Sequence, residues 1–251
     1  MKLKIIGLSS LLLILLAGCV TAPTPVVQDN RGVVAIDVDL RLKGDLFNLF
    51  PGFVEPNTIF FARLDKSGRA YDQDELYMSN YFIGDTAYLL NAVPGTYVAV
   101  GFRAYRKSEA KDKYTEGAYT LFDIMIPEKM IELTKVKVCS GRVSYMGEFH
   151  MVEPAFSERA KVVDRAQQHY YGKMIPLAYG DAYGKDYFKD KEFDLRKRAA
   201  IYSEINPTFG ALLEYHDNSR KRIGEHLKSA YSKMKETVWG PLFLRSLEGD
   251  C

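Results

Sequence analysis

Histidines and carboxylates are the first candidates for chemistry in this chain, and their spacing is unfavourable for it. The four histidines are His150, His169, His216 and His226. His216 and His226, with Glu214 or Asp217, are of metal-ligand type but not at a spacing that metal sites favour. We therefore expect surface histidines, no metal and no cofactor. The chain has no G-x-S-x-G, G-x-x-x-x-G-K-[ST], H-E-x-x-H or C-x-x-C motif, so no catalytic residue is predicted.

An acidic run, Asp72-Gln73-Asp74-Glu75, has the oxygen ligands that calcium prefers. It lacks the regular ligand spacing of a calcium loop. We expect a solvated loop.

Tyrosines alternate with glycines and aspartates between Tyr170 and Phe188, and Tyr179, Tyr183 and Tyr187 recur every four residues. Tyrosine brings a large amphipathic contact area at low entropic cost, and aromatic faces beside carboxylates suit sugars and peptides. Gly180 and Gly184 each weaken a helix by about 1 kcal/mol relative to alanine, which favours a loop. The three tyrosines are thus a candidate ligand-binding surface. The alternative is that the rings seal helices against the rest of the domain.

The N-terminus predicts export. A basic start, Met1–Lys4, precedes an apolar run of roughly twelve residues from Ile5, which as a helix rises only about 18 Å against the ~30 Å of a bilayer core. The segment is too short to span a membrane and indicates a secretory signal. A secreted protein with an incidental cysteine near its signal is one interpretation of Cys19.

The other interpretation comes from Leu16-Ala17-Gly18-Cys19, which resembles the lipobox of bacterial lipoproteins. The resemblance implies that residues 1–18 are removed, that the Cys19 thiol is diacylglycerylated and that the new amino terminus is acylated, for example with palmitate. Two or more acyl chains anchor a protein stably in a bilayer, so the membrane is the expected partner. Val20 stands where an aspartate would retain a lipoprotein at the inner membrane, which favours the outer membrane of the cell envelope.

The net charge of the mature chain bears on its possible partners. Loss of residues 1–18 removes Lys2 and Lys4, so the 34 basic residues fall to 32 and equal the 32 acidic ones. A neutral chain has no broad positively charged surface for nucleic acid, and we expect no nucleic-acid partner.

Cys139 and Cys251 form an even pair in an oxidising compartment, which suggests a disulfide. Two unpaired cysteines are the alternative.

Alternating apolar residues predict a β domain over residues 32–153, after a short lipidated tether at residues 19–31. In 33–42, Val34, Ile36 and Val38 share one face, and Asp37 and Asp39 share the other. Further strands are predicted at 58–64, 76–83, 97–105, 119–126, 136–139 and 143–152. Both faces of 97–105 are largely non-polar, so this strand is expected to be central. The shared period of two predicts one sandwich core that contains Val34, Ile36, Val38, Val98, Val100, Phe102, Val143 and Tyr145. The pattern is typical of an antiparallel β-sandwich of the immunoglobulin-like class.

Two stretches carry a second resemblance: N-A-V-P-G-T-Y-V-A-V at 91–100 and S-G-R-V-S-Y-M-G-E-F at 140–149. Together they resemble prealbumin-like sandwich domains, which also occur in bacterial lipoproteins of unknown function. The resemblance implies a fold and no activity.

From residue 154 the apolar period becomes helical, so residues 154–251 are predicted as a helical C-terminal extension of an α+β protein. Helices are expected from Pro154 to Tyr170, at 185–204 and 218–237, with a short helix starting at Asn206-Pro207. Their narrow apolar stripes need the sandwich, and we expect them to cover the second face of the 97–105 strand. The function predicted is a non-enzymatic binding or structural module of the envelope, with an envelope protein or glycan as its partner. A hydrolase of envelope polymers is the alternative.

Overall fold

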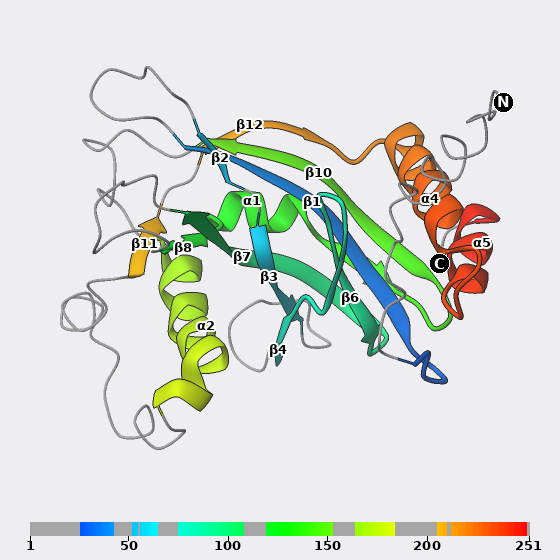
Figure 1. The fold of residues 1–251 in the computed structure, drawn as a ribbon, viewed down its shortest axis with the longest axis horizontal. Helices are drawn as coiled ribbons and strands as arrows, with labels where there is room; N and C mark the ends of the chain where they lie inside the picture. Colours follow the sequence, from blue (N-terminus) through cyan, green and yellow to red (C-terminus); the bar gives the residue numbers. More distant parts are fainter. Residues whose placement is uncertain are drawn as a thin grey trace, which may run out of the picture.

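The computed structural model describes most of the predicted β domain and three stretches of the C-terminal region. The described residues are 26–42, 52–54, 56–64, 75–107, 119–152, 164–183, 205–209 and 212–249. Within them, two β-sheets are stacked, and α-helices lie on the outer faces of the sandwich (Figure 1). The signal segment with Cys19, the predicted helix at 185–204, Tyr187 and Cys251 lie outside the described residues.

Sheet A contains the first strand of the domain at its centre. Its strand order is β12 (Leu212–Asp217), β10 (Val143–Val152), β1 (Gly32–Leu42), β6 (Thr86–Ala92) and β5 (Tyr81–Ile83), with β2 (Gly52–Val54) paired to the end of β1. β1 is antiparallel to β6 but parallel to β10. The sequence predicts an antiparallel sandwich, and most pairs are antiparallel. The parallel pairing of β1 with β10 was not predicted, because side-chain alternation is the same for both strand directions.

Sheet B is centred on the strand expected to be central. Its order is β11 (Ile205–Phe209), β8 (Tyr119–Met125), β7 (Gly95–Lys107), β3 (Pro56–Arg63) and β4 (Glu75–Met78), with β9 (Val136–Val138) on the start of β7. The single strand predicted at 76–83 is two strands in two sheets. Between them, Ser79 N–H donates to Ile59 O of sheet B and Asn80 N–H donates to Tyr88 O of sheet A. The chain changes sheet at these two residues.

The main hydrophobic core joins the two sheets. It contains six of the eight residues predicted for it: Val34, Ile36, Val38, Val98, Val100 and Phe102. The prediction was wrong for Val143 and Tyr145, which belong to a second cluster on the outer face of sheet A, although Phe149 and Met151 of the same strand lie in the main core.

A bulge in β10 explains this change of face. Ala35 of β1 pairs with Tyr145 of β10, and Asp37 pairs with Glu148. Between these two pairs β1 advances by two residues, whereas β10 advances by three. The extra residue in β10 reverses which side chains point outward. It is accommodated at Gly147, whose φ of 118° is strained for any residue with a Cβ.

The helices cover both outer faces. They are α1 (Glu128–Leu133), α2 (Arg165–Tyr183), α4 (Arg220–Met234) and α5 (Gly240–Leu247). α4 and α5 pack on sheet A through the second cluster, which includes Leu227, Met234, Leu242 and Phe243. α2 packs on sheet B, where a Cβ at Gly101 would lie 2.8 Å from Met174 Sδ. α2 therefore supplies the cover predicted for the 97–105 strand, and α4 with α5 lies on the other side of the sandwich (Figure 1).

Two local predictions after residue 154 were wrong. The helix expected from Asn206-Pro207 is replaced by β11 and β12. β11 is an edge strand paired with β8, and a proline is tolerated at an edge because one side of the strand needs no donor. The loop expected from Tyr179 is helical up to Tyr183. Buried Tyr170, Tyr171 and Met174 hold the preceding turns of α2 against sheet B, and this packing outweighs the weak propensity of the glycines.

No helix in the described ranges has the length and apolar character needed to cross a membrane.

Candidate functional site

The outer face of sheet A changes character halfway along its two central strands. On β1, Val33 and Ala35 are buried under α4 and α5, and the next outward residues are Asp37 and Asp39. On β10, the outward residues after Tyr145 are Glu148 and His150, because of the bulge. The polar half of this face begins at the N-terminus of α4, beyond which the helix no longer covers the sheet. Acidic and histidine side chains are thereby gathered beside a helix end.

Strand register brings these polar residues together in pairs. Asp37 lies opposite Glu148, and Asp39 lies opposite His150. His150 lies between two carboxylates, with Nδ1 3.3 Å from Asp39 Oδ2 and Nε2 2.9 Å from Glu148 Oε1. A carboxylate only accepts hydrogen bonds, so both contacts form together when the ring carries two N–H groups. Both ring nitrogens of His150 are therefore engaged by carboxylate oxygens.

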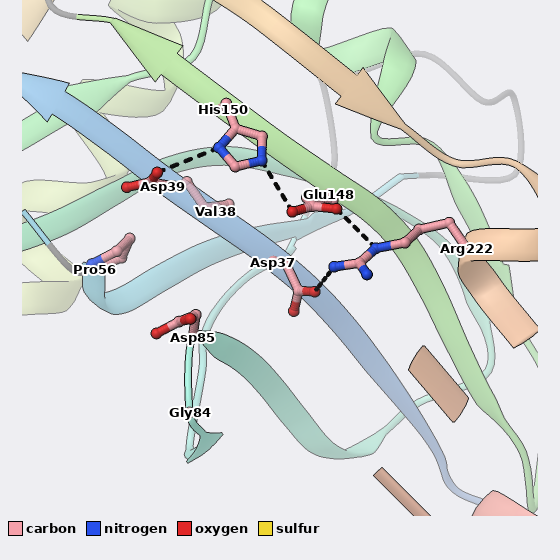
Figure 2. Close-up of a pocket in the computed structure, with 9 residues that line it drawn as sticks. All are labelled: Asp37, Val38, Asp39, Pro56, Gly84, Asp85, Glu148, His150 and Arg222. Atoms are coloured by element: carbon pink, nitrogen blue, oxygen red, sulfur yellow. Dashed lines mark hydrogen bonds and ion pairs between the residues drawn. The ribbon is translucent and has the colours of Figure 1, made fainter. Parts of the chain in front are cut away.

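Arg222 of α4 continues this network to Asp37. Its Nε lies 2.8 Å from Glu148 Oε2, and its Nη2 donates to Asp37 Oδ2 at 3.4 Å (Figure 2). The helix start fixes the position of Arg222. The Ser219 side chain accepts a hydrogen bond from Arg222 N, and Asp217 Oδ1 accepts one from Ser219 N. Hydrogen bonds from the backbone and side chain of Ser219 lower the pKa of the Asp217 carboxyl.

Asp37 is the most strongly held carboxylate of the group. Tyr145 OH donates to its Oδ2 at 2.7 Å, and His226 Nδ1 lies 3.8 Å from the same oxygen. Burial alone would raise the pKa of Asp37. Hydrogen bonds from His226, Thr86 and Tyr145, with the charge on His226, outweigh burial and leave the pKa below its ordinary value. Asp37 is therefore ionised at neutral pH.

Aromatic packing supports this carboxylate from below. The Tyr145 and His226 rings stack 3.8 Å apart and nearly parallel, at 3°, and His226 Nε2 lies 3.4 Å from Tyr88 OH. Burial raises the pKa of the Tyr88 and Tyr145 hydroxyls, and for both the charge of Asp37 adds to the effect. Both hydroxyls therefore keep their protons and remain hydrogen-bond donors.

A cavity of about 270 Å³ opens above this network. It is lined by Asp37, Val38, Asp39, Pro56, Gly84, Asp85, Glu148, His150 and Arg222 (Figure 2). Asp85, at the exposed turn between β5 and β6, lines the same cavity (Figure 2). Among the described residues of the lining there are thus four carboxylates, one guanidinium and one imidazole. The excess of negative charge suits a ligand that carries a positive group.

None of the described residues in this lining is a serine, cysteine or lysine. Both ring nitrogens of His150 are already engaged by carboxylates, and Asp37, with its lowered pKa, has no proton to donate at neutral pH. Within the described part of the chain, no group of three or more His, Cys, Asp or Glu side chains has a geometry that could hold a metal ion.

Two of the sequence-predicted site residues, Tyr179 and Tyr183, lie in α2, which packs on sheet B, whereas this pocket lies on sheet A. Tyr187 lies outside the described residues. Their role in binding stays a prediction. Glu75, at the end of the acidic run predicted to be a solvated loop, lies on β4 and pairs with Arg63 at 3.2 Å. Cys139 is disulfide-bonded, to a partner outside the described residues.

The pocket residues were missed for a physical reason. Asp37 and Asp39 have the pattern of an ordinary solvated strand face, and His150 and His226 were interpreted as scattered surface residues. The usable signal was Asp-x-Asp in one strand and Glu-x-His in another, each at a period of two. It becomes a site only when these strands are neighbours.

The fold and pocket define the class of protein: a two-sheet α+β sandwich with helices on both faces and a carboxylate-rich cavity on one of them. In comparisons with known proteins, no family, curated protein or solved structure matched the chain significantly. The pocket itself therefore carries the functional argument.

Proposed function

We propose that the protein is a lipoprotein of the bacterial cell envelope, anchored through Cys19, and that its sandwich domain is a non-enzymatic binding module. Its ligand is a small molecule, or an exposed group of an envelope protein or glycan, that carries a positive charge. The lipobox at Leu16–Cys19 supports the anchor, and Val20 supports the outer membrane. The prealbumin-like resemblance of 91–100 and 140–149 is compatible with the two-sheet fold.

One observation carries the binding proposal. Asp37 is largely buried, keeps a lowered pKa through its interactions with His226, Thr86 and Tyr145, and lines an acid-rich cavity. A partly buried charge destabilises the folded state unless hydrogen bonds or an ion pair compensate it. Serines or lysines on this strand face would lower that free-energy cost. A pre-organised negative site recognises a cation without rearrangement, because its carboxylates are already positioned.

The binding test uses mature protein purified in detergent. Alkylamines, choline and a lysine-containing peptide are titrated against matched uncharged alcohols, with calorimetry as the readout. Asp39→Asn and Asp85→Asn should each weaken amine binding about tenfold, the loss expected for one charge-assisted hydrogen bond. Glu132→Gln removes an exposed carboxylate on α1, away from the pocket, and should leave binding unchanged. Equal affinity for amines and alcohols would contradict the proposal.

The anchor has its own test. Cys19→Ser should be released from membranes or left unprocessed, because no thiol remains to acylate. A variant that matures and fractionates like the parent would remove the lipoprotein from the proposal and leave the pocket untouched.

The alternative function is hydrolysis of an envelope polymer, and one observation favours it: the cavity combines carboxylates with a histidine. Incubation with peptidoglycan and envelope peptides, followed by mass spectrometry of products, distinguishes the two. Turnover that Glu148→Gln abolishes would replace the binding proposal with the hydrolase.

A further inference from the structure

The chain enters the folded domain beside α4 and α5. Val26, the first described residue, is held by Asn91, whose Nδ2 donates to Val26 O at 2.9 Å. Asn91 Oδ1 in turn accepts from Gln28 N at 2.9 Å. Val27 packs against the cluster that α4 and α5 form with sheet A. The segment that follows Cys19 therefore meets the domain on its α4–α5 side.

The tether between anchor and domain is short. Cys19 and Val26 are seven residues apart, which even fully extended is about 25 Å at roughly 3.6 Å per residue. A lipid on Cys19 would thus hold the α4–α5 side of the domain close to the bilayer.

This side of the molecule is basic although the mature chain is neutral. Residues 218–249 contain seven Lys or Arg and three Asp or Glu, a net charge of +4, so the rest of the mature chain has a net charge of −4. Lys228, Lys233 and Lys235 are exposed. The acidic Glu225 and Glu236 lie within 4 Å of lysines and neutralise part of this charge. The remaining excess is positive and complements anionic lipid headgroups.

Apolar side chains project from the same region. Val238, in the turn between α4 and α5, is 64% exposed, and Leu244 on α5 is 42% exposed. Each is too isolated to form a core. Together with the nearby lysines, they match the composition of surfaces that rest in the headgroup layer, with apolar groups inserted and basic groups at the phosphates.

We propose that Lys228, Lys233, Lys235, Val238 and Leu244 form a docking surface for an anionic lipid bilayer, the membrane to which Cys19 anchors the protein. This surface, the α4–α5 surface, rests on the proposed lipidation. It goes beyond the anchor, because it fixes one face of the domain against the bilayer instead of leaving the domain free on its tether. Arg222 of α4 lines the pocket, so docking also sets the pocket at the edge of the bound face.

The test uses mature, lipidated protein reconstituted into vesicles of phosphatidylethanolamine and phosphatidylglycerol. Val238→Trp places a reporter on the α4–α5 surface, and Met78→Trp, 38% exposed on β4 of sheet B, is its control. The native Trp239 is fully buried and contributes the same background fluorescence in both variants. Brominated lipids should quench Val238→Trp at least about twofold more than Met78→Trp, because bromine reaches only groups at the headgroup and acyl boundary.

Charge reversal makes the test specific to the surface. Lys228→Glu with Lys235→Glu should abolish the extra quenching, as should vesicles of phosphatidylcholine alone. Lys129→Glu with Lys135→Glu is the matched control, since both lysines are exposed and Lys135, like Lys235, pairs with a nearby glutamate. This pair should leave the quenching unchanged.

Flotation separates the two proposals. If the protein does not float with vesicles, the anchor fails and the docking surface fails with it. If it floats but both tryptophans are quenched equally, the anchor stands and docking is overturned. A blue shift of Val238→Trp without quenching by brominated lipid would indicate a protein contact, such as a second copy, and would equally overturn docking.

Discussion

Tyr145 and Asp37 are joined across the parallel pair of sheet A by a 2.7 Å hydrogen bond from the Tyr145 hydroxyl to Asp37 Oδ2. Tyr145 is the last outward residue of β10 before the bulge, and its ring stacks on His226 of α4. This one side chain therefore belongs both to the apolar cluster under the helices and to the polar network. It marks the boundary between the supporting and functional halves of the sheet face.

Tyr145→Phe should destabilise the protein by about 1.5–3 kcal/mol, since it removes a neutral donor from a largely buried carboxylate and keeps the ring. Urea unfolding measures the change. Tyr215→Phe is the matched control, because its hydroxyl bonds to an exposed carboxylate, Asp217, at 3.3 Å. Its effect should stay within about 0.5 kcal/mol. Equal effects of the two substitutions would show that the Tyr145–Asp37 hydrogen bond contributes no more to stability than the Tyr215–Asp217 bond.

The lowered pKa of Asp37 predicts a pH dependence of the free energy of unfolding. A carboxyl whose pKa is lower in the folded than in the unfolded chain contributes stability that is fully present above its ordinary value of 3.8. That contribution is lost as the pH falls through the folded pKa. The parent should therefore exceed Asp37→Asn in stability at neutral pH, and the difference should shrink between about pH 5 and pH 2. A difference that stays constant over this range would contradict the lowered pKa.

Sequence alone could predict the parts of the fold that depend on local period. The strands at β1, β3, β7, β8 and β10 follow from alternation, and the amphipathic stripe of α4 follows from helical spacing. The candidate site could not be predicted in this way. It depends on β1 and β10, about a hundred residues apart, being neighbours in register, and on one extra residue at Gly147. Neither the partner of a strand nor the position of a bulge is encoded in alternation.

The bulge glycine should be intolerant of substitution. At Gly147 a Cβ would lie 2.8 Å from Asp217 O, and the φ of 118° disfavours any L side chain. Gly147→Ala should cost about 1–3 kcal/mol and weaken amine binding, because relief of the clash moves Glu148 and the start of α4. Gly224→Ala in α4, where a Cβ meets nothing, should instead stabilise the protein by roughly 0.5–1 kcal/mol. Thermal unfolding of both variants, with the calorimetric titration, provides the comparison.

The partner of Cys139 is the last prediction, and the neighbouring contacts favour Cys251 over Cys19. Arg142 Nη1 donates to the carbonyls of Arg245, at 3.0 Å, and Gly249, so the described end of the chain lies against the turn that follows Cys139. We propose a Cys139–Cys251 disulfide, which also leaves Cys19 free for lipid. It would close about 110 residues and contribute up to about 4–5 kcal/mol in the chain-entropy model.

Peptide mapping of the mature protein without reductant should find one cross-linked pair containing both cysteines. Cys251→Ser should lower the thermal midpoint as far as reduction lowers that of the parent, whereas reduction of Cys251→Ser should change nothing further. A peptide joining Cys139 to Cys19, or a Cys251→Ser protein that reduction still destabilises, would assign the bond to the N-terminal cysteine and remove the basis for the lipid anchor.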